Sequence, residues 1–114
     1  MFARLMGLST ISPSKLHRRI QGGEPVTIID VNARLRWQEA HVPGAVNVDP
    51  DGYDEGELPL DKSAELVFYC SNMMCRKAPR AAARARKMGY GNVQVMSAGI
   101  QGWLAAELPT ADDG

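Results

Sequence analysis

The stretch that decides the fold reads E-L-V-F-Y-C-S-N-M-M-C-R-K-A-P-R and spans Glu65–Arg80. Its first part, Leu66–Tyr69, is an apolar and aromatic run typical of a strand buried on both faces. Cys70 closes that strand, a short loop follows, and a cationic, alanine-rich helix is predicted over Lys77–Met88. A thiol between a strand end and a helix N-terminus faces unpaired backbone N–H groups and the positive end of a helix dipole. This environment favours the nucleophilic thiolate, so the stretch indicates cysteine chemistry.

Strands alternate with helices on both sides of this stretch. Further strands are predicted at Val26–Val31, Ala45–Val48 and Val93–Met96. Further helices are predicted from Pro13 to about Ile20, over Leu35–Glu39 and over Gly99–Leu108, while residues 49–64 form a polar, acidic loop. The alternation predicts an α/β fold with a central, mainly parallel sheet flanked by helices. Ligands bind beyond the carboxyl ends of the strands in such sheets, and Cys70 lies at one of these ends.

Length, charge and cysteine content exclude several classes of function. The chain has 114 residues, which fits one domain, and its net charge of zero provides no overall field that draws it to nucleic acid or a membrane. Two cysteines are too few for a disulfide framework, and no histidine lies near them at zinc-ligand spacing, so we expect no metal and no cofactor. The start of the chain lacks the apolar core of a signal peptide, and a cytoplasmic location is expected.

Five short motifs follow one another along the chain. They are D-V-N (30–32), H-V-P-G-A-V-N (41–47), V-F-Y-C (67–70), G-Y-G-N-V (89–93) and A-G-I-Q-G-W (98–103). In this order they resemble the rhodanese (thiosulfate sulfurtransferase) homology domain in its small single-domain form. The resemblance divides the chain into an N-terminal extension (1–9), a rhodanese-like domain (10–109) and a loose C-terminal tail (110–114).

The resemblance implies a sulfurtransferase with Cys70 as its catalytic residue. The Cys70 thiolate would take a sulfane sulfur from thiosulfate or a low-molecular-weight persulfide, hold it as a persulfide, and pass it to a thiol or cyanide. Loop N–H groups and two cations would bind the donor anion. The predicted active-site and anion-binding loop comprises Ser71, Asn72, Met73, Met74, Cys75, Arg76 and Lys77. A sulfur-accepting protein that docks on the cationic face of the following helix is a further expected partner.

Four other residues, Asp30, Asn32, His41 and Trp103, are expected to support the site. Asp30 is predicted to tie down its neighbouring loop through backbone N–H groups, His41 to hold the turn at Pro43, and Trp103 to form a wall beside the site. Cys75 has two interpretations that the sequence leaves open. It either packs inside a tight loop or acts as a redox-resolving thiol that forms a disulfide with Cys70.

The chain departs from the common rhodanese pattern. Asn32 stands where the family usually has arginine, and Arg36 stands where an acidic residue is common. The spacing Cys70-x5-Arg76 gives a seven-residue loop, which is similar to that of phosphatases and arsenate reductases of the same fold. Such a phosphatase or arsenate reductase is therefore one alternative, although the loop offers no carboxylate as the general acid that a phosphatase needs. A non-catalytic rhodanese-like module that binds partners is the other.

Overall fold

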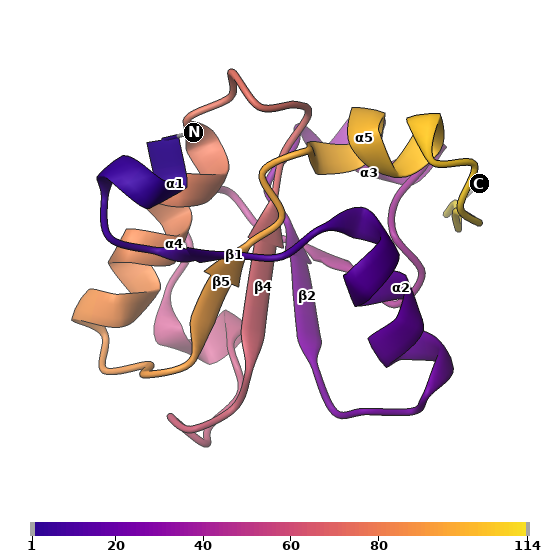
Figure 1. Cartoon of the computed structure of the whole chain (residues 1–114). Helices are drawn as coiled ribbons and strands as arrows, with labels where there is room; N and C mark the ends of the chain where they lie inside the picture. The colour runs from indigo at the N-terminus through magenta and orange to yellow at the C-terminus, as the bar shows by residue number, and fades with distance from the viewer. Residues whose placement is uncertain (1, 114) are drawn as a thin grey trace.

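The computed structural model describes residues 2–113 and shows a five-stranded parallel sheet flanked by helices (Figure 1). The strands are β1 (Ser9–Thr10), β2 (Thr27–Asp30), β3 (Val46–Asn47), β4 (Leu66–Tyr69) and β5 (Val93–Val95). The helices are α1 (Phe2–Leu5), α2 (Pro13–Gln21), α3 (Arg34–Glu39), α4 (Lys77–Lys87) and α5 (Gly99–Ala105), with a 3-10 turn at Glu55–Glu57. Every neighbouring pair in the order β1-β5-β4-β2-β3 is parallel. The predicted α/β fold is confirmed.

Local sequence signals set the ends of the helices. Ser12 caps α2, because its hydroxyl accepts a hydrogen bond from the Lys15 N–H at 3.2 Å, and Pro13 occupies the first helical position. In α4 the only proline, Pro79, lies in the first turn, where its missing N–H costs no helical hydrogen bond. The first residues of α2 and α4 therefore lie within a few residues of the positions that the sequence predicts.

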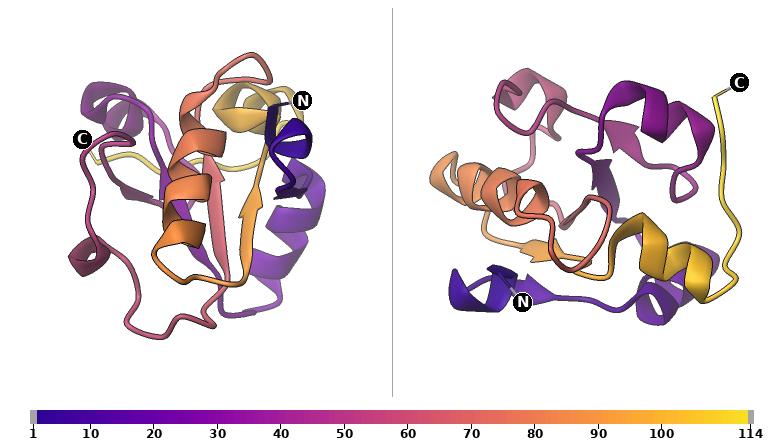
Figure 2. Two further views of the ribbon diagram at one scale, coloured as in Figure 1. Left: turned by 90° about the vertical axis from the view of Figure 1, so that its left-hand side faces the viewer. Right: turned by 90° about the horizontal axis from the view of Figure 1, so that it is seen from above.

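The sheet separates two buried layers of side chains. On one face α4 packs against the sheet through its alanines, and their small size lets the helix lie close to β4 and β5. On the other face α2 and α5 enclose Leu16 and Trp103, both fully buried. The view from above in Figure 2 shows α4 on one side of the sheet and α2 with α5 on the other.

Both ends of the chain are tied to the domain, and the prediction of a loose tail is wrong over the described residues. At the start, Ala3 is buried and β1 extends the sheet beside β5. At the end, Ala111 exchanges two backbone hydrogen bonds with His41, and the Asp113 N–H donates to the Gln38 carbonyl. Figure 2 shows this segment running from α5 across to α3. Residues 1 and 114 of the predicted extension and tail lie outside the described residues.

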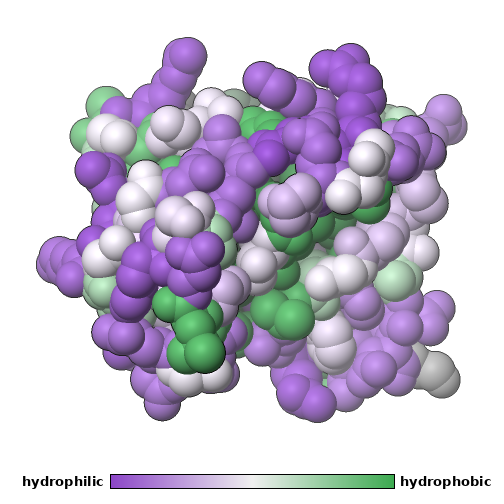
Figure 3. All heavy atoms as spheres, turned by 90° about the horizontal axis from the view of Figure 1, so that it is seen from below, coloured by the Kyte–Doolittle hydropathy of each residue, from purple (hydrophilic) through white to green (hydrophobic). Residues whose placement is uncertain are grey.

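The order of the strands places a crevice at the carboxyl ends of β2 and β4. The chain leaves β2 toward β3 on one side and leaves β4 toward β5 on the other. Ligands of open parallel sheets bind where the connections diverge in this way. The loop between β4 and α4 lies at this end, at the top of Figure 1. The opposite end, seen in Figure 3, is mainly hydrophilic, with hydrophobic groups in separate small patches.

Candidate active site

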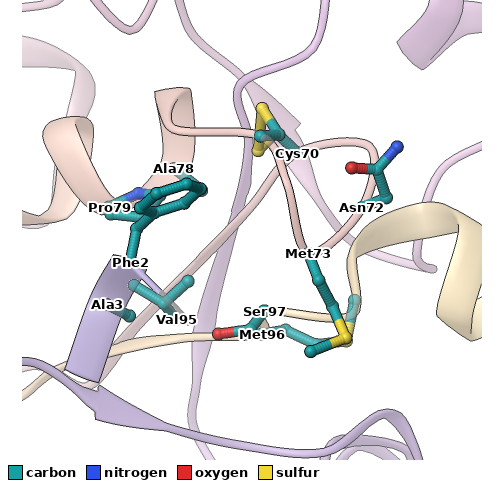
Figure 4. A pocket seen from close by; sticks show the side chains of 11 residues that line it. Phe2, Ala3, Cys70, Asn72, Met73, Ala78, Pro79, Val95, Met96 and Ser97 are labelled. Carbon is teal, nitrogen blue, oxygen red and sulfur yellow. A yellow bond between two sulfur atoms is a disulfide. The ribbon is translucent and has the colours of Figure 1, made fainter. Parts of the chain in front are cut away.

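A disulfide between Cys70 and Cys75 closes the loop that follows β4. The two Cα atoms are 6.5 Å apart, and the bridge spans five positions. We call residues 70–76 the cysteine loop. Cys70 is only 3% exposed, whereas Cys75 is partly exposed, and Figure 4 shows the bridge beside Phe2 and Ala78. The structure therefore brings together the two thiols whose relation the sequence left open.

The first turn of α5 anchors the cysteine loop through the backbone. The Ile100 N–H donates to the Cys70 carbonyl at 2.9 Å, and the Gln101 N–H donates to the Ser71 carbonyl at 3.0 Å. Gly99 makes this approach possible, because it has a φ of +67° and a Cβ at this position would lie 2.5 Å from the Ser71 carbonyl carbon. Sequence reasoning did not assign Gly99 to the site, although the motif A-G-I-Q-G-W contains it.

Two N–H groups of the predicted anion cradle are used inside the loop itself. Met74 donates its N–H to the Asn72 side-chain oxygen at 2.9 Å, and Cys75 donates its N–H to the Asn72 carbonyl at 3.1 Å. The hollow beside the disulfide has a volume of about 10 Å³, which holds about one water molecule. In the disulfide form the loop is thus closed, and the expected anion-sized space above Cys70 is not present there.

The two cations of the predicted loop point to different places. The Arg76 guanidinium carbon lies 4.5 Å from the centre of the Phe2 ring, so a cation–π contact holds this side chain against α1. Lys77 instead lines a second cavity. Farther along α4, Arg80 pairs with Asp51 at 2.9 Å, which ties part of the cationic face to the acidic loop.

The second cavity, of about 490 Å³, lies in the crevice between the ends of β2 and β4. It is large enough for a small organic ligand. Its walls include Asn32, Arg36 and Glu39 on the α3 side, Ser71 and Lys77 beside the cysteine loop, and Gln101 on α5. Two cations and one carboxylate therefore face the same space, next to the residue that follows Cys70.

Asp30 supports the crevice from below, as the sequence predicts. It is fully buried, and its carboxylate accepts the Asn32 N–H at 2.8 Å. Burial raises the pKa of the Asp30 carboxyl, and the Tyr69 hydroxyl and the Asn32 N–H offset this only in part. Asn47, which sequence reasoning did not assign, donates to the carbonyls of Asp30 and Asn32 at 3.0 and 2.9 Å. Asn47 ends the H-V-P-G-A-V-N motif, and this position was the sequence signal that could have assigned it to the site.

His41 and Trp103 have roles that differ from those predicted. The His41 ring stacks on Trp37 and its Nδ1 lies 2.6 Å from the Trp37 carbonyl oxygen, while its backbone pairs with Ala111. His41 thus fastens the C-terminal segment to α3. Trp103 lines neither cavity beside the loop; it is fully buried and donates its ring N–H to the Pro109 carbonyl at 2.7 Å. The prediction that Trp103 forms a wall of the site is wrong.

Replacing Asp30 with asparagine should change how stability depends on pH. Because the folded-state pKa of Asp30 is raised, its contribution to stability is present below the ordinary pKa of 3.8 and is lost as pH rises through the folded value. Asparagine keeps an oxygen for the Asn32 N–H and carries no charge. We therefore expect the free energy of unfolding in urea to fall with rising pH more in the native protein than in Asp30→Asn. If the free energy of unfolding changed with pH in the same way in both proteins, the raised pKa of buried Asp30 would be contradicted.

Over residues 2–113, no group of three or more histidine, cysteine, aspartate or glutamate side chains is arranged to hold a metal ion. In the same part of the chain, none of the helices has the length and apolar character required to span a membrane.

Known proteins resemble this chain both in sequence and in fold. The chain is 34% identical over 104 residues to the HTH-type transcriptional regulator Rv0324 of Mycobacterium tuberculosis, and the match covers 91% of this chain but 45% of that regulator, less than half of its length. It is 25% identical to the thiosulfate sulfurtransferase GlpE of Haemophilus influenzae, over 91% of this chain and 95% of that protein. The BH2092 protein of Bacillus halodurans has the same fold, with a TM-score of 0.85 at 22% identity over 98% of this chain and 84% of that chain.

The family comparison covers most of the domain. The model described as a rhodanese-like domain matches residues 12–106, which include β2 to β5, the cysteine loop and α5. Relatives of this chain with sulfurtransferase names support a sulfurtransferase-type family. The match over residues 12–106, together with the parallel sheet and the cysteine loop at the crevice, shows that the chain belongs to the family of rhodanese-like domains.

Proposed function

We propose that this chain is a sulfurtransferase in which the reduced Cys70 carries a sulfane sulfur as a persulfide. The Cys70–Cys75 disulfide is the observation that carries the proposal. In it, the loop accommodates a second sulfur atom bonded to Cys70 Sγ. A persulfide is the same sulfur–sulfur linkage with the outer sulfur free of the protein, and that outer atom would take the place of the Cys75 sulfur.

The transfer proceeds in two displacement steps at sulfur. The Cys70 thiolate attacks the outer sulfur of thiosulfate, the sulfur–sulfur bond of the donor breaks, and sulfite leaves with its electron pair. Cyanide then attacks the outer sulfur of the persulfide, thiocyanate forms, and the Cys70 thiolate returns. With a persulfide donor a thiolate leaves in place of sulfite, and with a thiol acceptor a new persulfide forms in place of thiocyanate.

Cys75 would act as the resolving thiol of the same loop. In the disulfide form Cys70 is bonded and the adjacent hollow is too small for thiosulfate, so this form cannot accept sulfur. A dithiol such as dithiothreitol reduces the bridge to two thiols and is itself oxidised to its disulfide. The oxidised loop thus protects Cys70 from irreversible oxidation to sulfinic and sulfonic acids.

Mass spectrometry of the full chain tests this proposal directly. The protein is reduced, freed of reductant and incubated with thiosulfate, and we expect a gain of one sulfur, about 32 Da, that maps to Cys70. Addition of cyanide should remove the gain and release an equal amount of thiocyanate. An aryl phosphate is run in parallel. Cys70-dependent turnover of the phosphate without any sulfur gain from thiosulfate would favour the phosphatase interpretation of the loop.

A further inference from the structure

The two cysteines of the disulfide differ in their exposure to solvent. Cys70 closes β4 and is 3% exposed, and its surroundings include Pro79 of α4, Met96 after β5, and Phe2 of α1 (Figure 4). Cys75 lies on the outer part of the loop and is partly exposed. An external thiol that opens the bridge must reach one of these two sulfurs.

The exposure of each cysteine decides which sulfur an external thiol can attack. In thiol–disulfide exchange a thiolate bonds to one sulfur of the bridge and the other sulfur leaves, so the attacked atom must be open to the incoming group. Cys70 is nearly fully buried between β4, α4 and α1, which hinders such an approach. Cys75 offers one from the solvent side.

We propose that low-molecular-weight thiols open the bridge by attacking Cys75, which makes Cys75 a site of S-thiolation and releases Cys70 as the thiolate. One sulfur–sulfur bond breaks and one forms between the incoming sulfur and Cys75 Sγ, and the Cys70 sulfur leaves with the electron pair. A second molecule of the external thiol, as its thiolate, then attacks the external sulfur that is bonded to Cys75. This step frees Cys75 and yields the external thiol in its dimeric disulfide form.

Charge around the loop favours an anionic thiol. Arg76 and Lys77 follow Cys75 directly and are exposed, and among residues 2–113 neither has a carboxylate within ion-pair distance. Arg36 lines the same cavity as Lys77, and Glu39 is the one acidic residue on that wall. The net positive charge should attract a small thiol that carries carboxylate groups.

Peptide mapping of the opened bridge tests the site of attack. The oxidised, full-length protein is mixed with glutathione as the probe, quenched after short intervals with excess N-ethylmaleimide, digested, and analysed by mass spectrometry. We expect glutathione on Cys75 and maleimide on Cys70, because alkylation of the released thiolate prevents the bridge from closing again. Glutathione on Cys70, on both cysteines in equal amounts, or on neither would overturn the proposal.

A charge comparison tests the class of thiol. Lys77→Gln should slow opening by glutathione about threefold relative to opening by the cationic thiol 2-aminoethanethiol. Lys87→Gln makes the same change at the far end of α4 and should leave the ratio of the two rates unaltered. Equal slowing of both thiols by Lys77→Gln would show an effect on loop structure and would overturn the preference for an anionic thiol.

The inference rests on the proposed function only in its choice of Cys70 as the reacting thiol. Both measurements use the oxidised protein and need no sulfur donor. A protein that shows Cys75 thiolation but gains no sulfur from thiosulfate would refute the proposed function alone, and the reverse result would refute the inference alone.

Discussion

We expect Cys70→Ser to eliminate both the sulfur gain and the release of thiocyanate. We expect Cys75→Ser to retain Cys70-dependent turnover and to need no reductant. A serine hydroxyl does not form a persulfide, so the loss should reach about a thousandfold or more, down to the background rate. In Cys75→Ser no bridge can form, and the loop is held in the form that accepts sulfur. Thiocyanate release measured with and without prior dithiothreitol treatment distinguishes the two variants.

Mild peroxide provides the companion measurement on the same proteins. The native, reduced protein should lose the mass of two hydrogen atoms as peroxide oxidises the two thiols to the bridge, and dithiothreitol should reverse this loss. Cys75→Ser has no partner thiol, and we expect it to gain oxygen atoms on Cys70 and to lose activity irreversibly. If the native protein also gains only oxygen atoms, Cys75 does not protect Cys70 and the resolving role is refuted. Cys70→Ser serves as the control for oxidation at other residues.

The sequence was sufficient to predict four of the five strands, because its signals there are local and strong. The β-branched and aromatic runs that became β2 and β4 have no competing interpretation, and Ser12 with Pro13 marks the start of α2 within one residue. The short edge strand β1 was missed. Two exposed residues, Ser9 and Thr10, have no pattern of their own and become a strand only because β5 offers them a partner.

The position of Cys70 at a strand end was predictable, whereas the geometry of the candidate site was less so. The strand end identifies Cys70 without a structure, but nothing in the residues 71–77 shows where each side chain points. Arg76 rests on a ring from α1, and Trp103 turns into the opposite core layer, because tertiary contacts outside the motif decide both orientations. Likewise, the loose tail expected after residue 109 is fixed by its pairing with His41, a contact between distant parts of the chain.

Gly99 explains why the last motif lies so close to the cysteine loop, and Gly99→Ala is expected to be strongly disruptive. Alanine is strained at a φ of +67°, and its Cβ would lie 2.5 Å from the Ser71 carbonyl carbon and 2.7 Å from the Asn72 nitrogen. These neighbours are backbone atoms, so the loop or α5 must move. We expect the free energy of unfolding to fall by about 2–4 kcal/mol in a urea titration.

Gly91→Ala is the matched control for this substitution. Gly91 is exposed, and a Cβ there meets no atom within 4 Å, so its effect on stability should stay within about 0.5 kcal/mol. Any Gly99→Ala protein that remains folded should also form the Cys70 persulfide at least about tenfold more slowly, because the hydrogen bonds from Ile100 and Gln101 to the loop can no longer hold it in place. A Gly99→Ala protein with native stability and native persulfide formation would show that the contact between α5 and Ser71 does not position the cysteine loop.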